Sequence, residues 1–451
     1  MRIHESDISI PSIFHSEDPL SAARDLVGAA LGPDQLPIRF VVSKSDHEVC
    51  HCEIGLIDDA TPQDRERIGS IFDYRQRGPE DTSEFNAVFM VPTGIGSTIG
   101  GHAGDATPAV RILSEICDRV ILHPNVVNAS DVNEMPENAL YVEGSVLSRL
   151  MMGTVGLQPV RANRVLTVMD NHADSEMRDA TINTVNSARA VYGLSSDQTV
   201  LLEPPIELSA HYSGSGRASG MADRMDHLIA LLADRAGTYD AVAVATIIGV
   251  PLALEDEYFK SHGEMINPWG GAEAIFTHTL SGLFNVPTAH APMTADKEAG
   301  DLVLGTVDPR MAAEAISFTF FQCVLKGLRQ APQIVERTTE GWPDGSLTAK
   351  DVSCLVIPDK CVGLPTLAAL KQGIPVIAVR ENENILENDL TQLPWAPGKF
   401  FLVENYWEAA GVVAALKHGL DPYAARRPLN GTSVEVYEGP ADAFKAGGTA
   451  A

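Results

Sequence analysis

From residue 85 onward, short apolar runs alternate with stretches of helical spacing. Each run has the length of a buried strand, and each intervening stretch repeats its apolar residues with the period of a helix face. This alternation is typical of βαβ units on a parallel sheet. The expected strands span residues 87–91, 119–122, 164–169, 199–202, 241–248, 354–357, 375–379 and 400–403, and the main expected helices span 109–116, 175–192, 221–236 and 309–328.

Residues 1–84 follow a different pattern. Two strand-like runs, 38–42 and 49–54, are separated by a polar segment, and residues 76–84 are charged, as in a surface loop. We therefore predict an α/β fold that is doubly wound, with mostly parallel sheets in two lobes and a small N-terminal α+β unit. The expected ranges are 1–84 for the N-terminal unit, 85–205 for the first lobe with its Gly-rich loop, and 206–445 for the second lobe.

Three segments share a weak pattern of a glycine, an apolar stretch of helix length and a short strand that opens near a proline. They span residues 144–161, 271–290 and 363–378. An internal duplication is one explanation of the pattern. The other is that the same turn and strand-start residues recur wherever a helix leads into a strand.

Composition and charge limit the classes of protein to which this chain can belong. The chain has 451 residues, of which 45% are hydrophobic and 21% are charged, so a sizeable core is available. Lys and Arg number 33 against 60 Asp and Glu, and the resulting net charge of −27 repels phosphate backbones. We expect no nucleic-acid partner, whereas a small anion can still bind at a local arginine or a helix N-terminus.

The location expected from the sequence is the cytoplasm. Residues 1–11 lack the basic and apolar regions of a secretory signal, and no apolar stretch reaches the ~20 residues that span a bilayer. The six scattered cysteines suit free thiols in a reducing compartment. These features predict no membrane partner and no disulfide, and they leave homo-oligomerisation open.

The strongest local signal is a loop with five glycines between residues 93 and 107. It follows an expected strand and precedes an expected helix, which is where open α/β sheets bind ligands. Backbone N–H groups in such a loop can hold a carboxylate or a phosphate, although the spacing is neither a Walker A nor a dinucleotide motif. The alternative is a purely structural loop. The residues expected to bind substrate here are Thr93, Gly94, Gly96, Ser97, Thr98 and Asp105.

Further polar residues follow other expected strands. His123 comes directly after one strand and is a candidate general acid or base, with Asn125 and Asn128 able to orient a carbonyl group. Glu143 stands at a strand–helix junction and His290 follows a later strand, so both are candidate catalytic residues. A packed turn histidine and a helix-start carboxylate are the structural alternatives.

Arg161 and Asn163 lie between two strand-like runs and are candidate anion ligands, with a surface salt bridge as the alternative for the arginine. Asp170, His172 and Asp174 alternate after a strand, as metal ligands can, but Asp174 is also an ordinary helix N-cap. We therefore predict no metal site, and the sequence identifies no cofactor.

Several of these blocks together resemble a family known only as a domain of unknown function, number 3326, of cyanobacteria, other bacteria and plants. The resemblance runs from about residue 87 to 382. It implies a shared fold and a shared site, and it implies no catalytic role. The blocks that carry it are the Gly-rich loop 92–108 and residues 123–128, 141–144, 289–292 and 319–332.

These observations favour an enzyme that acts on a small carboxylated or phosphorylated metabolite. A lyase, hydrolase or isomerase would use His123 or His290 as acid or base, Glu143 as a second carboxylate and Arg161 as the anion anchor. The alternatives are a sugar-nucleotide-dependent transferase, in which the helix after residue 363 would hold a diphosphate, and a non-catalytic metabolite-binding protein.

Overall fold

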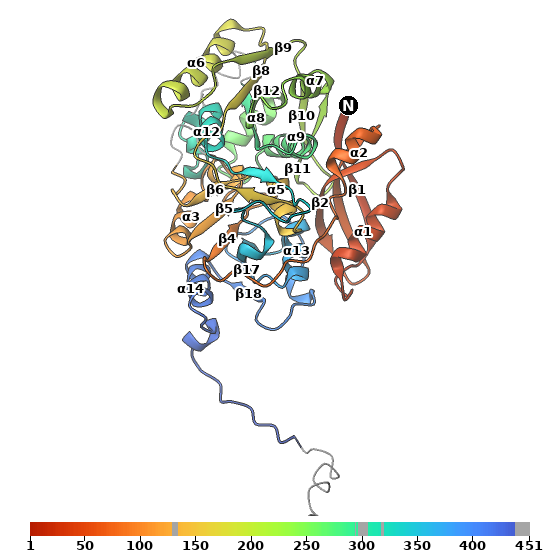
Figure 1. Ribbon diagram of the computed structural model, residues 1–451, viewed down its shortest axis with the longest axis vertical. Coiled ribbons are helices and arrows are strands. Elements are labelled where there is room, and N and C mark those ends of the chain that lie inside the picture. Colours follow the sequence, from red (N-terminus) through yellow and green to blue (C-terminus); the bar gives the residue numbers. More distant parts are fainter. Residues whose placement is uncertain (129–133, 294, 296–304, 317–319, 438–451) are drawn as a thin grey trace, which may run out of the picture.

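The computed structural model describes residues 1–128, 134–293, 295, 305–316 and 320–437. Within these residues, one sheet has six parallel strands in the order β18-β17-β15-β4-β5-β6. Figure 1 shows the strands β4, β5 and β6 in the middle of the molecule. The strands are β4 (Asn86–Phe89), β5 (Arg119–Leu122), β6 (Ala139–Tyr141), β15 (Val352–Pro358), β17 (Val376–Val379) and β18 (Phe400–Val403).

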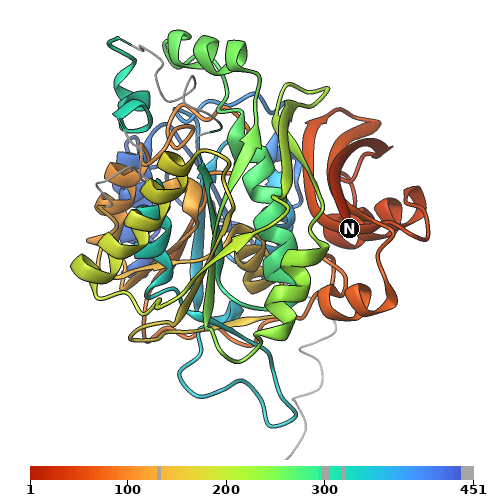
Figure 2. The ribbon, with the colours of Figure 1, turned by 90° about the horizontal axis from the view of Figure 1, so that it is seen from above.

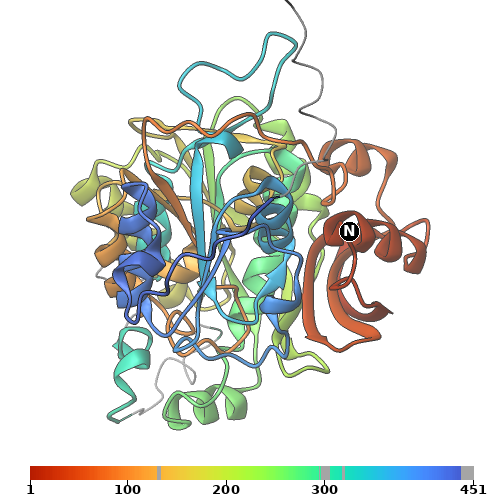
Figure 3. The same cartoon turned by 90° about the horizontal axis from the view of Figure 1, so that it is seen from below.

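A second sheet of ten strands is parallel at one end and antiparallel at the other. The antiparallel end curls into a half-barrel, which is visible at the red strands in Figures 2 and 3. The parallel end holds β8 (Val165–Asp170), β9 (Thr199–Leu202), β12 (Ala241–Gly249) and β13 (Thr288–Met293). The antiparallel end holds β1 (Arg2–Pro11), β2 (Leu36–Ser45), β3 (Val49–Asp58), β10 (Glu207–Tyr212), β11 (Ala218–Asp223) and β16 (Val362–Gly363). A separate antiparallel pair joins β7 (Gly156–Gln158) to β14 (Gln333–Val335).

Helices cover both faces of the six-stranded sheet. Its strands alternate their side chains between two buried clusters, as expected of a parallel sheet covered on both sides. One cluster includes α5 (Gly144–Met151) and α13 (Leu364–Gln372), and the other includes α3 (Thr107–Ser114), α12 (Phe320–Leu328) and α14 (Tyr406–Lys417). The remaining helices are α1 (Pro19–Ala30), α2 (Pro62–Ile68), α4 (Pro124–Val127), α6 (Ser175–Tyr192), α7 (Asp226–Asp234), α8 (Leu252–Lys260), α9 (Trp269–Phe284) and α11 (Ala312–Ile316), with short 3-10 turns at Pro309–Met311, Ala349–Asp351, Leu390–Gln392 and Pro422–Ala425.

The predicted mixed α/β class with parallel sheets is confirmed. The strands expected in the N-terminal unit are β2 and β3, and they belong to the ten-stranded sheet. Each of the two large sheets takes strands from both sides of residue 205, so that expected lobe boundary does not coincide with a boundary between sheets. Of the helix expected over residues 309–328, the described residues form the 3-10 turn Pro309–Met311 and the helices Ala312–Ile316 and Phe320–Leu328.

The prediction of a helix from residue 221 was wrong at its start, because β11 continues to Asp223 and the helix α7 begins at Asp226. The cause is a contact distant in sequence. A Cβ atom on Gly220 would lie 2.3 Å from the Cα atom of Ala272, and one on Gly271 would lie 2.4 Å from the carbonyl oxygen of Ala218. Helix α9 therefore packs directly on the backbone of β11, and this packing overrides the local helical pattern.

We expect Gly220→Ala to lower the free energy of unfolding by about 1–3 kcal/mol, because the added methyl group must push α9 away from β11. Denaturant unfolding measures this change. The control is Gly411→Ala in α14, where the space is open and alanine should stabilise the helix by about 0.5–1 kcal/mol. Equal effects of the two substitutions would contradict the close contact.

Candidate functional site

A cavity of about 730 Å³ lies beyond the carboxyl ends of β4, β5, β6 and β15. The chain order runs in opposite directions on the two sides of the β15–β4 pair, so this is the topological switch point at which open α/β sheets bind ligands. Residues of α5, α9 and β2 and the start of α13 also line the wall, together with residues of α2, α6, α12, β12 and β13. Parts of the chain that are far apart in sequence therefore share one cavity.

The Gly-rich loop forms part of this wall through Thr93, Gly94, Gly96 and Ser97. Gly94 and Gly96 have φ angles of 82° and 65°, a conformation that side chains rarely adopt. Among the described residues, the N–H groups of residues 94–97 have no hydrogen-bond acceptor, and the buried Oγ atom of Ser97 has no partner. Successive free N–H groups in a loop of this kind favour an anion.

His123 lines the cavity at the end of β5, where it is 5% exposed. Its Nε2 atom accepts a hydrogen bond from the N–H of Val91 at 3.2 Å. The proton of the neutral ring is therefore on Nδ1, which has no partner among the described residues. Burial lowers the pKa of His123 to about 4. This geometry favours a neutral hydrogen-bond donor over the general acid or base expected from the sequence.

The two asparagines near His123 line the cavity, but their amides are already engaged. Asn125 Nδ2 donates to the carbonyl oxygens of Val91 and Gly100, each at 2.9 Å, and so ties the Gly-rich loop to α4. Asn128 Oδ1 accepts a hydrogen bond from the hydroxyl of Tyr141 at 2.9 Å. Both side chains therefore shape the wall, and their direct binding of substrate stays a prediction.

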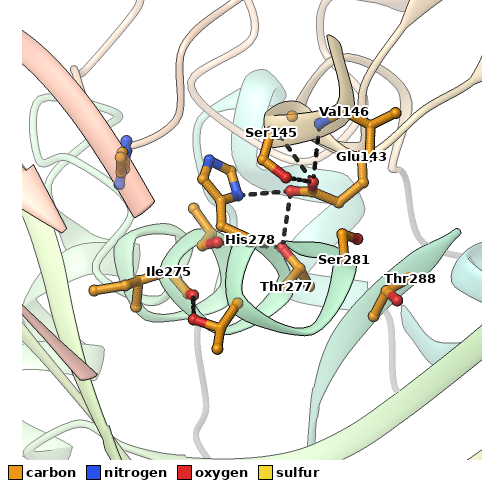
Figure 4. A network of polar contacts seen from close by, with 12 residues as sticks. Glu143, Ser145, Val146, Ile275, Thr277, His278, Ser281 and Thr288 are labelled. Carbon is orange, nitrogen blue, oxygen red and sulfur yellow. Dashed lines mark hydrogen bonds and ion pairs between the residues drawn. The ribbon is translucent and has the colours of Figure 1, made fainter. Parts of the chain in front are cut away.

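Glu143 forms the centre of a second group of polar residues (Figure 4). It is the N-cap of α5, and its Oε2 atom accepts from the N–H of Ser145 at 2.9 Å. Its Oε1 atom lies 2.6 Å from Nδ1 of His278 on α9, and the Thr277 hydroxyl also reaches it at 3.3 Å. Burial acts to raise the pKa of Glu143, but His278 and Ser145 outweigh burial and keep this pKa below its usual value.

The contact with Glu143 fixes the orientation of His278. The carboxylate contacts Nδ1 at ion-pair distance, although the angle between the two groups does not meet the geometry of a hydrogen bond. A proton on Nδ1, facing the carboxylate, would leave the lone pair on Nε2. The ring lines the cavity, and Nε2 has no hydrogen-bond partner among the described residues. The pair can therefore accept a proton at Nε2 while Glu143 stabilises the resulting imidazolium, which is the arrangement of a general base with its orienting carboxylate.

His290 lines the cavity from the middle of β13 and makes two contacts. Its Nδ1 atom lies 3.1 Å from Oε1 of Glu273 on α9, and its Nε2 atom lies 2.8 Å from the hydroxyl of Thr246. Both ring nitrogens are therefore occupied within the protein. His290 is placed to hold Glu273, and its own predicted catalytic role remains a prediction.

The four other predicted ligands lie outside the cavity wall, which corrects their expected position. Thr98 is exposed and donates to the carbonyl oxygen of Glu383, and Asp105 accepts from the N–H groups of Gly100 and His102 inside the loop.

Arg161 and Asn163 precede β8, at the amino end of that strand, whereas ligands approach the carboxyl end. Arg161 is exposed, and Asn163 is buried with its amide bonded to the carbonyl oxygens of Leu328 and Ala331.

The alternating Asp170, His172 and Asp174 make structural contacts. Asp170 accepts from the N–H groups of Ile206 and Ile247, and Asp174 caps α6. No group of three or more His, Cys, Asp and Glu side chains is placed to hold a metal ion within the described residues.

Sequence reasoning missed several residues of the wall, among them Arg39 and His278. Arg39 lies on β2, where its Nη1 atom pairs with Glu5 at 2.9 Å and its Nη2 atom donates to the carbonyl oxygen of Thr93 at 3.0 Å. His278 lies in the middle of α9 among apolar residues and follows no strand. The available signal was the spacing of Glu273 and Thr277 on α9, since polar side chains four apart mark one face of an otherwise apolar helix.

Residues 86–426 match the family model of DUF3326, a protein family of unknown function. The chain belongs to this family. A Synechococcus protein named as an uncharacterised lipoprotein is 35% identical over 344 residues, which cover 75% of this chain and 92% of that protein. No solved structure matches the chain. The resemblance drawn from the sequence motifs is therefore confirmed, and no reaction comes with the family.

The expected cytoplasmic location is contradicted, because the similar Synechococcus protein is a lipoprotein by name, which points to membrane association. The sequence argument considered apolar spans, and a protein without such a span can still be held at a membrane by an acyl chain. Among the described residues, no single helix has the length and apolar character to cross a membrane. The helical segments Pro309–Ile316 and Phe320–Leu328 together have the length and apolar composition of a membrane span, but their axes form an angle of 93°.

The Gly-rich loop should make stability depend on pH through Asp105. Burial raises the pKa of Asp105 to about 7 from its ordinary 3.8, so the folded chain holds this proton where the unfolded chain has lost it. The contribution of Asp105 to the free energy of unfolding therefore falls as pH rises from about 4 to about 7. Asp105→Asn keeps the Oδ1 acceptor and cannot ionise.

We expect Asp105→Asn to match the native chain near pH 4 and to exceed its free energy of unfolding by roughly 1–4 kcal/mol at pH 8. Urea unfolding of both proteins at several pH values measures the difference between their free energies of unfolding. The contributions of the other titrating groups are the same in both proteins and cancel in this difference. A difference that stays constant with pH would exclude the raised pKa.

Proposed function

We propose that this chain is an enzyme that moves a proton on a small carboxylated or phosphorylated metabolite, as a lyase, hydrolase or isomerase does. The observation that supports this most directly is the Glu143–His278 pair, in which the two side chains are 2.6 Å apart. His278 lines the cavity, and its Nε2 atom has no hydrogen-bond partner among the described residues. We also propose that the two large sheets form two lobes with the cavity between them.

In this proposal each group has one role. His278 takes a proton from the substrate or from a water molecule, and Glu143 stabilises the charge that His278 gains. The free N–H groups of residues 94–97 hold the anionic group of the substrate. His123 donates from Nδ1 to the oxygen on which negative charge develops, and it stays neutral because burial holds its pKa near 4.

Deuterium exchange tests the base without knowledge of the complete reaction. Small carboxylates and phosphates are first screened by thermal shift, because a ligand that binds the folded chain raises its melting temperature. Each stabilising compound is then incubated with the protein in D₂O. Proton NMR should show loss of a C–H signal or hydrolysis, and His278→Asn should slow either change by ~10²–10⁴-fold.

His418→Asn is the matched control, because His418 is exposed after α14 and should leave the rate unchanged. Tight binding with no exchange and no turnover would instead favour a non-catalytic binding protein. Protection by UDP-sugars alone would favour the transferase.

His123→Ala should lower the same exchange rate by ~10²–10³-fold, the usual cost of one donor to a developing oxyanion. The pH dependence above pH 5 should not change, since an imidazole with a pKa of about 4 is neutral throughout that range. The measurement is the exchange rate between pH 5 and 9. If the exchange rate of the native chain rises between pH 6 and 7 and this rise is absent in His123→Ala, then His123 titrates as the base.

A further inference from the structure

Two helices run along the cavity and position residues at known intervals. Helix α9 contributes residues from Trp269 to Gly282, and α5 contributes Ser145, Ser148 and Arg149 after its N-cap Glu143. The Glu143–His278 pair, the Gly-rich loop and Arg149 all line the same cavity.

Arg149 is a half-buried arginine without an ion-pair partner. Its Nη2 atom donates to Oδ1 of Asn285, the C-cap of α9, at 2.8 Å. Its Nη1 atom is buried and has no acceptor among the described residues. Within those residues no carboxylate lies in ion-pair contact with it, and the carboxylates that influence it most, Glu336 and Glu143, act from farther away. Burial accordingly lowers the pKa of Arg149.

The hydroxyl groups beside Arg149 do not compensate its charge. Ser148 donates to the carbonyl oxygen of Gly144, and Thr154 donates to that of Arg149 itself. A buried guanidinium with an unused N–H group is unfavourable unless an acceptor reaches it. Because Arg149 lines the cavity, a turn of its side chain would bring the buried Nη1 atom to a carboxylate or phosphate oxygen of a ligand, which would supply both the acceptor and the opposite charge.

The two helices give similar distances from this arginine to the proton-transfer pair. Arg149 follows Glu143 by six residues, and Asn285, which holds Arg149, follows His278 by seven residues. At 1.5 Å per residue these separations are about 9 Å and about 10 Å along the helix axes. A group bound at Arg149 is therefore well separated from the reacting atom at His278.

We propose that Arg149 binds a second anionic group of an elongated substrate whose first anionic group is held by the Gly-rich loop. This inference rests on the proposed function, because the loop is taken as the first anchor. It specifies the substrate class as a doubly anionic compound with carboxylate or phosphate groups at both ends and the reacting atom between them.

The experiment compares dicarboxylates of increasing length, from malonate through glutarate and pimelate to azelate, with monocarboxylates of the same chain lengths. Thermal shift and calorimetry on the full chain measure binding. We expect longer dicarboxylates to bind roughly 10- to 100-fold more tightly than their monocarboxylate counterparts, as a charged hydrogen bond implies. Arg149→Met should abolish this advantage and leave monocarboxylate binding unchanged.

Arg67→Met is the matched control, because Arg67 also lines the cavity but is exposed and stacks over Phe284 at 5.8 Å. It should keep the preference for long dicarboxylates. Repeating the series with ω-phosphorylated carboxylates distinguishes a distal phosphate from a distal carboxylate, and either result supports the subsite.

Three results would overturn the inference. They are equal binding of dicarboxylates and monocarboxylates, a preference that survives Arg149→Met, and a strong coupling between Arg149 and Glu336 in the ligand-free chain, measured by a double-mutant cycle. The last result would mean that Arg149 serves a structural ion pair. Failure of the deuterium exchange alone would contradict the proposed reaction and leave the subsite standing.

Discussion

The direct packing of α9 on β11 is the contact on which the candidate site depends. A side chain at Gly220 or Gly271 would separate the two backbones, since a Cβ atom at either position would lie within 2.5 Å of the other element. The same helix presents Glu273 and His278 to the cavity and holds Arg149 through its C-cap. A small outward shift of α9 would therefore move Glu273, His278 and Arg149 together. Small residues at this contact serve the placement of polar groups as much as they serve the core.

Buried ion pairs attach the curled antiparallel strands to the cavity. Arg39 pairs with Glu5, and Arg217 on the loop before β11 pairs with Glu53 on β3. The pKa of Glu5 stays below its usual value because Arg39 and Arg217 outweigh the opposite effect of burial. Removal of one partner would leave a charge buried without compensation, which is costly. These pairs therefore fix the position of β2, from which Arg39 reaches the Gly-rich loop.

The parts of the site that follow parallel strands could be predicted from the sequence. The loop at Gly94, the turn at His123 and the cap at Glu143 each come directly after a strand, and parallel strands bring their carboxyl ends to one edge. Arg161 was misplaced because a polar residue before a strand lies at the opposite edge. Neither His278 nor Arg39 follows a strand of the six-stranded sheet, so no local pattern connected either residue to this edge.

The role of His123 shows a further limit of sequence reasoning. A histidine after a strand predicts acid–base chemistry only if one ring nitrogen is basic and free. Here the N–H of Val91 occupies Nε2, and burial holds the pKa near 4, so the ring is suited to donate from Nδ1. His278 has the opposite arrangement, because Glu143 occupies its Nδ1 side.

Two histidines in one cavity thus differ in chemistry because of the partner at the other ring nitrogen. Residues of the family region 86–426 supply both histidines, their partners and the Gly-rich loop, whereas Arg39 comes from the strands that precede it. The groups proposed to transfer a proton therefore lie within the family region, while Arg39, which contacts the loop, lies outside it.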